Sequence, residues 1–197
     1  MKIAVSGLSG CGNSTACLAV AKALRLKSIN FTFRDLAEEL GMDFEDLAEK
    51  RKQDRGYDLL LDKMQLGLYG RELDAIMGSR LAIWLADANL RVWLDAPLEI
   101  RAKRIAKRET KSFEDAFDRT KRRDIEDRKQ YLRLYGIDIL EHDFADLILD
   151  AEKFNALQIA RKIISEAKKD KYKNVQKSKY GDKIIGKIEA NLKSIKC

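Results

Sequence analysis

A glycine-rich segment near the N-terminus constrains the fold of this 197-residue chain more than any other feature. It lies between a short apolar run at 2–6 and a stretch at 14–26 whose apolar residues fall at helical spacing. This order predicts a strand, a tight loop and a helix. Glycines let successive backbone N–H groups face one anion, and the start of the helix adds about half a positive charge. The predicted phosphate-binding loop consists of Gly7, Leu8, Ser9, Gly10, Cys11, Gly12, Asn13, Ser14 and Thr15.

The loop matches the frame G-x-x-x-x-G-K-[ST] at every position except one, because Asn13 stands in place of the lysine. Ser14 offers a hydroxyl oxygen, a hard ligand suited to Mg²⁺ on the terminal phosphates of a nucleotide. The amide of Asn13 can donate a hydrogen bond but carries no charge. This loss costs about 3 kcal/mol, or about a hundredfold in rate, unless another cation reaches the site. A loop without a ligand is a weaker alternative, as is a dinucleotide site, because Thr15 stands where a third glycine belongs.

The rest of the chain alternates apolar strands with helices. Strands are predicted at 29–33, 75–77, 90–94 and 147–149. Helices are predicted at 34–40, 43–52 (with Asp43 as N-cap), 57–68, 97–105, 112–135 and 156–167. The alternation predicts an α/β fold with a parallel sheet, helices on both faces and ligands at the carboxyl ends of the strands.

The net charge of +7 lies in the last 30 residues, since 1–167 holds 29 basic and 29 acidic side chains. We therefore divide the chain into a body, 1–167, and a lysine-rich C-terminal extension, 168–197. Apolar residues at helical spacing from 184 to 195 could form an amphipathic helix that docks on the body or a partner, but a solvated or partly ordered extension is the default. Specific nucleic-acid binding is not expected, whereas weak contact of the extension with polyanions is compatible with its lysines.

Composition also narrows the class of protein. No apolar run approaches the roughly 20 residues of a membrane span, and the N-terminus lacks the layout of a signal peptide. Three cysteines and one histidine, with no C-x-x-C spacing, argue against a disulfide framework or an ordinary zinc site. We expect a cytoplasmic protein without membrane contact.

Four further segments occur in the order found in a known family: FRDLA at 33–37, GSRLAIW at 78–84, APLEIRAKRIA at 96–106 and YGID at 135–138. With the loop, they resemble the nucleoside monophosphate kinases over about 1–164, and most closely the archaeal-type cytidylate (CMP) kinases. The resemblance implies a P-loop kinase fold with a five-stranded parallel sheet, an acceptor region near 33–68 and a mobile helical lid around 104–131. It implies Mg²⁺-dependent transfer of the γ-phosphoryl group of ATP to a nucleoside monophosphate, CMP or dCMP.

The same resemblance assigns the acceptor site to arginines. It implies that Arg34 and Arg80 hold the acceptor phosphate and that Arg123 and Asp127, in the run RDIEDR at 123–128, contact the pyrimidine and its phosphate. The physical chemistry agrees, because an arginine fork binds phosphate through two parallel hydrogen bonds and Arg80 follows a predicted strand end. The alternative for each arginine is a surface ion pair.

Lid arginines are expected to neutralise the transferring group, and Arg104 and Arg108 are the catalytic candidates together with Asn13. Lys103 and Lys107 are further candidates for the compensating cation. The sequence departs from the family at Ser79, where an acidic residue is frequent, and at Gln130, where a basic residue is expected. Two rival functions stay open: a nucleotide-binding regulatory or scaffold protein that has lost efficient transfer, and a kinase for another small acceptor.

Three smaller features have mainly structural interpretations. Trp84 and Trp93 lie in apolar patterns and are predicted in the core. His142 has no catalytic context and is predicted at the surface. Cys11 is predicted to be a small filler of the loop rather than an oxidisable thiol with a lowered pKa.

Overall fold

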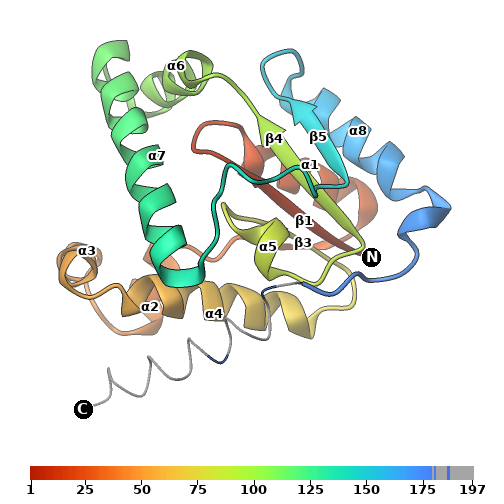
Figure 1. Ribbon diagram of the computed structural model, residues 1–197, viewed down its shortest axis with the longest axis horizontal. Helices are drawn as coiled ribbons and strands as arrows, with labels where there is room; N and C mark the ends of the chain where they lie inside the picture. Colours follow the sequence, from red (N-terminus) through yellow and green to blue (C-terminus); the bar gives the residue numbers. More distant parts are fainter. Residues whose placement is uncertain (179, 181–185, 187–197) are drawn as a thin grey trace.

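The computed structural model describes residues 1–178, 180 and 186. Within this part, five parallel strands form one sheet in the order β2-β3-β1-β4-β5 (Figure 1). The strands are β1 (Lys2–Gly7), β2 (Lys27–Ile29), β3 (Ala75–Gly78), β4 (Leu90–Asp95) and β5 (Leu147–Asp150). The central strand β1 is buried on both faces, as parallel strands between helical layers are. The predicted five-stranded parallel sheet is confirmed.

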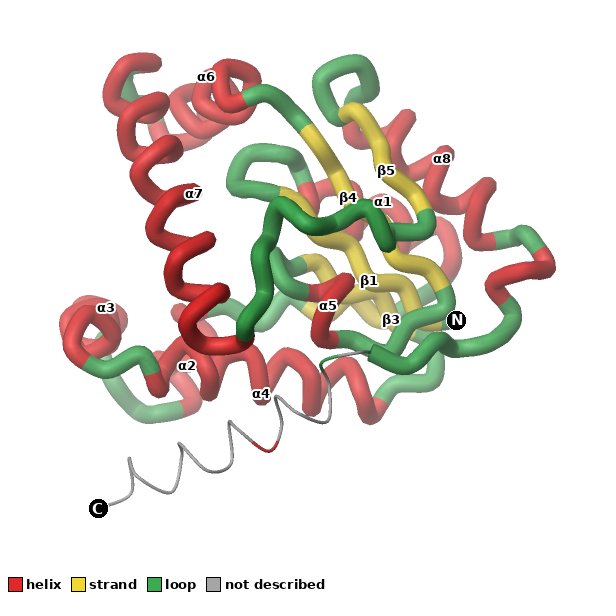
Figure 2. The backbone as a smooth tube through the Cα atoms, in the orientation of Figure 1, coloured by secondary structure: helices red, strands yellow, loops and turns green. Residues whose placement is uncertain are grey.

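Eight α-helices of the described residues surround the sheet. They are α1 (Asn13–Leu24), α2 (Phe33–Glu39), α3 (Phe44–Gln53), α4 (Gly56–Arg71), α5 (Ala82–Leu85), α6 (Leu98–Glu109), α7 (Phe113–Tyr135) and α8 (Ala156–Ala167). Ile3 and Val5 of β1 pack with α1 and α8, whereas Ala4 packs with α4 and α5. This alternation puts helices on both faces, as predicted. Helices α6 and α7 flank the carboxyl ends of β1 and β4 (Figure 2).

The strand predicted at 29–33 is wrong in its position. Strand β2 ends at Ile29, and Phe33 already belongs to α2. The Thr32 hydroxyl accepts hydrogen bonds from the backbone N–H groups of Arg34 and Asp35, while the Asp35 carboxylate accepts one from the Thr32 N–H. This capping box starts a helix in spite of the β-propensity of the aromatic and β-branched residues. The predicted N-cap at Asp43 is confirmed.

The described part of the C-terminal extension packs on the body. Tyr172 is buried, and Gln176 forms an antiparallel bridge with Ala88. The buried side chain of Asn89 donates to the carbonyls of Tyr172 and Lys173, and buried Arg91 donates to Gln176. The segment 170–178 is therefore an ordered part of the extension, because buried polar groups need hydrogen-bond partners and this segment supplies them, although most of its side chains are exposed. The helix proposed for 184–195 lies outside the described residues.

The two tryptophans lie in the core, as predicted. Their rings meet edge to face with centroids 5.8 Å apart, and each is almost completely buried. His142 is partly exposed at the surface, as predicted, and one side of its ring lies against Trp93 with centroids 4.2 Å apart. Among the described helices, none is both long and apolar enough to cross a membrane.

Candidate active site

The glycine loop lines a cleft of about 700 Å³ at the carboxyl end of β1. Gly10 and Gly12 have φ angles of 90° and 97°, a left-handed conformation that favours glycine. A Cβ at Gly10 would lie 2.8 Å from the carbonyl oxygen of Arg101, so the loop rests directly on α6. Ser14 and Thr15 are exposed in the first turn of α1 and line the cleft. All nine predicted loop residues lie at this cleft, which they share with Gly78, Ser79, Arg80, Arg104, Arg108, Arg123, Phe154, Asn155, Ala156 and Ile159.

Asn13 does not direct its amide nitrogen at the cleft. Its Nδ2 donates to the carbonyl of Gly7 at 2.9 Å, across the start of the loop. Its Oδ1 is buried and accepts no hydrogen bond from the described residues. The side chain that replaces lysine therefore stabilises the loop through a hydrogen bond between its two ends.

Cys11 fills the space beneath the loop. It is 2% exposed, and burial raises the pKa of its thiol to about 11 although Arg101 lies close by. Desolvation thus outweighs the favourable effect of nearby positive charge. The prediction of a small filler is confirmed, and the alternative of a lowered pKa is wrong.

Arg80 links the loop to the long helix α7. It lies two residues after the end of β3, at the carboxyl edge of the sheet, and it lines the cleft there. Its Nη2 donates to the Ser9 hydroxyl, and its Nε lies 3.0 Å from Oδ2 of Asp127. Arg123, one turn before Asp127, has its Nε 3.9 Å from the same oxygen. The structure therefore brings three of the four predicted acceptor residues together.

Positive charge accumulates in this corner of the cleft. The nearby Arg80 charge lowers the pKa of Arg123, and burial lowers it further. Each of these two positive charges makes the charged form of the other less favourable. A bound anion would offset this repulsion. Arg80 and Arg123 therefore place two positive charges around the Asp127 carboxylate at the edge of the cleft.

A second cavity of about 540 Å³ lies between α3, α6 and α7, and it shares Arg108 and Arg123 with the loop cleft. Arg108 pairs with Glu109 at 3.0 Å, and its side chain is 65% exposed. Arg104 reaches the other way, with Nη1 3.4 Å from the Gly10 carbonyl and Nη2 bonded to the Ala151 carbonyl. Basic residues that also line the second cavity are Arg51, Lys52, Arg55, Arg119 and Arg122.

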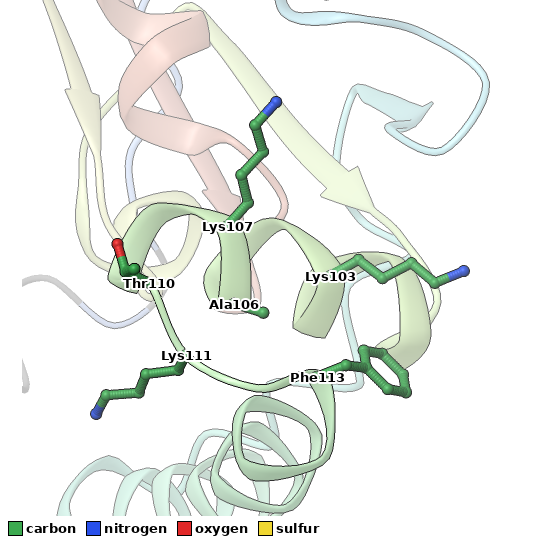
Figure 3. A pocket seen from close by; sticks show the side chains of 6 residues that line it. All are labelled: Lys103, Ala106, Lys107, Thr110, Lys111 and Phe113. Atoms are coloured by element: carbon green, nitrogen blue, oxygen red, sulfur yellow. The ribbon is translucent and has the colours of Figure 1, made fainter.

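Three candidates lie elsewhere. Arg34 is exposed on α2, with its guanidinium 4.7 Å from the ring of Phe44, and it lines neither cavity. Lys103 and Lys107 line a shallow hollow at the turn between α6 and α7, together with Lys111 and Phe113 (Figure 3). Residues one apart on a helix point in different directions, so Arg104 and Arg108 face the cleft while these lysines do not.

Arg101 is the main residue that sequence reasoning missed. Its side chain is only 5% exposed, and Nη1 lies 2.8 Å from Oδ2 of Asp124 on α7. The same Nη1 donates to the Ser9 carbonyl at 3.2 Å, and Nε donates to the Ala96 carbonyl at 3.0 Å. The available signal was the spacing of Arg101, Arg104 and Arg108, which places all three on one side of a helix that follows a strand.

Comparisons with known proteins agree with this geometry. A family model described as an AAA domain matches residues 3–131. Cytidylate kinase 2 of Borrelia garinii subsp. bavariensis is 39% identical over 179 residues, which cover 88% of this chain and 100% of that protein. Cytidylate kinase of Pyrococcus abyssi is 39% identical over 156 residues, or 78% of this chain and 86% of that protein. The chain belongs to the cytidylate kinase family.

Solved structures show that this cytidylate kinase family member has the P-loop kinase fold. Deoxyadenosine kinase from M. mycoides with bound dATP superposes with a TM-score of 0.57 at 18% identity, covering 86% of this chain and all of that one. Shikimate kinase from Bacteroides thetaiotaomicron gives 0.56 at 18% identity, covering 85% of this chain and 96% of that chain. The predicted family and fold class are confirmed.

The cleft of this cytidylate kinase family member offers one hydroxyl oxygen that suits Mg²⁺. In the described part of the chain, no group of three or more His, Cys, Asp or Glu side chains could hold an ion. At the cleft, the exposed Ser14 provides a hydroxyl oxygen beside the phosphate-binding amides. Mg²⁺ commonly takes one or two protein oxygens and completes its shell with phosphate and water, so Ser14 fits it.

A partly buried carboxyl group on α4 makes folding stability depend on pH. Burial raises the pKa of Asp62 to about 7, although Tyr135 donates a hydrogen bond to it. The folded protein therefore holds a proton that the unfolded chain releases near pH 4, so this group makes the free energy of unfolding decrease between pH 4 and 7. We expect Asp62→Asn to remove this dependence and to gain stability relative to the wild type as pH rises. Urea unfolding of both proteins at pH 5 and pH 8 checks this, and an equal difference at the two pH values would contradict it.

Proposed function

We infer that this cytidylate kinase family member transfers the γ-phosphoryl group of ATP to CMP, and we propose dCMP as a second acceptor. Family membership supports the reaction, and one structural observation carries it. The glycine loop and Arg80 line the same cleft, and that cleft shares Arg108 and Arg123 with a second cavity. Two phosphate-bearing substrates can therefore meet between two sets of donors. The rival in which the chain only binds nucleotide as a regulatory factor is not favoured.

On the donor side, several backbone amides within 7–15 face the phosphates of ATP at the start of α1. The helix end and the oriented N–H groups stabilise negative charge without any side-chain rearrangement. When bound with ATP, Mg²⁺ supplies charge neutralisation between the terminal phosphates, and Ser14 would hold it. Asn13 keeps the loop in shape through its bond to Gly7.

On the acceptor side, Arg80 and Arg123 hold the phosphate of the monophosphate. An oxygen of this phosphate attacks the γ-phosphorus, the bond to the β–γ bridging oxygen breaks, and ADP leaves with that electron pair. No covalent enzyme intermediate is required. Asp127 on α7 orients both arginines through its carboxylate. We propose that Asp127 also contacts the pyrimidine. Arg34, exposed on α2, would need α2 to approach the cleft for a direct contact.

Lid arginines supply the positive charge that Asn13 lacks. Arg108 is exposed at the junction of the two cavities, so its side chain is placed to reach the transferring group when α6 and α7 close over it. Arg104 sits beside Gly10 on the loop. Closure removes water, which strengthens each of these charge contacts. We propose Arg108 as the compensating cation and Arg104 as its neighbour on the donor side.

Two accompanying properties belong to the proposal. We propose a cytoplasmic location, which the two free, buried thiols Cys11 and Cys17 support. We also propose that the lysines of the C-terminal extension contact polyanions only weakly and without sequence preference.

A panel of acceptors tests the proposed function. ADP formation is followed in a coupled assay with ATP, Mg²⁺ and, in turn, CMP, dCMP, UMP, AMP, GMP and shikimate. We expect CMP and dCMP to give the largest kcat/KM values. Tight nucleotide binding without any diphosphate product would favour the regulatory alternative, and turnover of shikimate alone would favour a kinase for another small acceptor.

A further inference from the structure

Four successive carbonyl groups of the glycine loop each accept a hydrogen bond from outside the anion-binding face. The Gly7 carbonyl accepts from the side chain of Asn13 at 2.9 Å, and the Leu8 carbonyl accepts from the backbone N–H of Cys11 at 3.1 Å. The next two carbonyls, of Ser9 and Gly10, accept from arginines of α6 at 3.2 Å and 3.4 Å. The carbonyl side of the loop is therefore occupied by protein donors.

The direction of a carbonyl fixes the direction of the neighbouring amide. The described peptide bonds are all trans, so the N–H of Gly10 points opposite to the C=O of Ser9. Arg101 draws that C=O toward α6, and the close packing of Gly10 on the Arg101 backbone places α6 on this side. The N–H of Gly10 consequently points away from the Arg101 guanidinium, and Gly10 itself lines the cleft.

We propose that Arg101 is a positioning residue for the donor phosphates, because it holds the Ser9 carbonyl and thereby aims the Gly10 amide at the bound nucleotide. Arg101 does not touch the phosphate, since its guanidinium is buried among Ser9, Ala96 and Asp124. This inference deepens the proposed kinase function and rests on the donor side of it. Asn13 has a similar positioning role, because its side chain donates a hydrogen bond to the Gly7 carbonyl, the first of the loop.

Asp124 makes the position of Arg101 depend on α7. Its Oδ2 lies 2.8 Å from Nη1 of Arg101, and its Oδ1 is buried without a hydrogen-bond partner in the described part of the chain. Removing Arg101 alone would leave a buried charge unpaired, which is strongly destabilising. The test therefore needs one variant that keeps the charge and one that removes both charges together.

Two variants of the full chain satisfy this requirement. Arg101→Lys keeps the charge but has no planar fork, so it cannot hold Ser9, Ala96 and Asp124 at once. Arg101→Met combined with Asp124→Asn leaves no buried ion unpaired. The control is Lys103→Gln, which removes one positive charge from the same helix on a face that does not line the cleft. Thermal unfolding shows which variants are folded.

Equilibrium binding of ADP, tripolyphosphate and CMP is then measured by calorimetry. Tripolyphosphate isolates the phosphate contacts from those of the base. For both variants we expect about tenfold weaker binding of ADP and of tripolyphosphate, the loss that one well-aimed hydrogen bond to a charged group produces. CMP binding and the Lys103→Gln control should stay within about twofold of the wild type. In steady-state assays the KM for ATP should rise without a matching rise in the KM for CMP.

Two outcomes overturn the inference: donor binding within about twofold of the wild type in a folded variant, or equal losses for ADP and CMP. These results are separable from failure of the proposed function, because calorimetry requires no turnover. If the wild type binds ADP and phosphorylates no monophosphate, the kinase proposal fails while the role of Arg101 is still decided by the variants. If the Arg101→Met and Asp124→Asn pair does not fold, Arg101→Lys decides alone.

Discussion

Replacing Arg80 by alanine is expected to lower kcat/KM for CMP by about 30- to 1000-fold, or about 2 to 4 kcal/mol of transition-state stabilisation. Arg80 sits at the end of β3 between the Ser9 hydroxyl and the Asp127 carboxylate. Its removal takes away a fork that would hold the acceptor phosphate, and it leaves the Asp127 carboxylate facing that phosphate. Both effects oppose the approach of two anions.

The measurement is a full steady-state analysis with CMP varied at saturating ATP. Arg80→Lys keeps the charge without the fork and should lose less than Arg80→Ala. Arg71→Ala removes an exposed arginine at the end of α4 and should leave both kinetic constants unchanged. Affinity for ADP should be largely retained in Arg80→Ala. An equal loss of ADP binding would show that Arg80 serves the donor and would overturn its assignment to the acceptor.

Gly10→Ala should impair use of ATP much more than Gly12→Ala does. Both residues have left-handed φ angles near 90°, so alanine strains either position by about 1 to 2 kcal/mol. Only at Gly10 does the added Cβ also collide, since it would lie 2.8 Å from the Arg101 carbonyl oxygen and 3.0 Å from the Arg101 Cα. A Cβ at Gly12 would meet no heavy atom within 4 Å apart from those of its two chain neighbours. We expect kcat/KM for ATP to fall at least about tenfold further in Gly10→Ala.

The comparison of these two variants isolates the collision from the backbone strain. Thermal unfolding of each variant, with and without ADP, shows whether the fold or only the nucleotide site is affected. We expect the stabilisation that ADP gives to be smaller in Gly10→Ala than in Gly12→Ala. Similar losses of kcat/KM for ATP in the two variants would mean that backbone strain alone accounts for the loss. The packing of the loop on α6 would then be unimportant for the donor site.

The sheet and most helices could be predicted from the sequence because their apolar patterns are strong and local. Strand β1, the glycine loop and α1 follow in the predicted order, and the helix predicted at 156–167 coincides with α8 (Ala156–Ala167). The error at 29–33 arose because a capping box, rather than the propensity of the aromatic residues, decided where α2 begins. The short helix α5 was missed, since four residues carry too little periodic signal.

The candidate site was only partly predictable. Motif spacing could place the loop and Arg80 at one edge of the sheet, because parallel strands end together there. It could not distinguish Arg101 from Arg104 and Arg108, since which arginine turns inward depends on a carboxylate in another helix, Asp124. Nor could it show that Asn13 turns toward Gly7, because that contact exists only once the loop has closed.

The packing of 170–178 on the body ties two distant parts of the chain together. The stretch from Arg80 through α5 to β4 rests on this segment through Ala88, Asn89 and Arg91. Two of the hydrogen bonds join residues that are 83 and 85 positions apart in the sequence. Contacts of such long separation slow folding, because the entropy of closing the intervening chain is lost before they form. We therefore expect the surroundings of Arg80 to become ordered late in folding, after the local contacts of the glycine loop and α1.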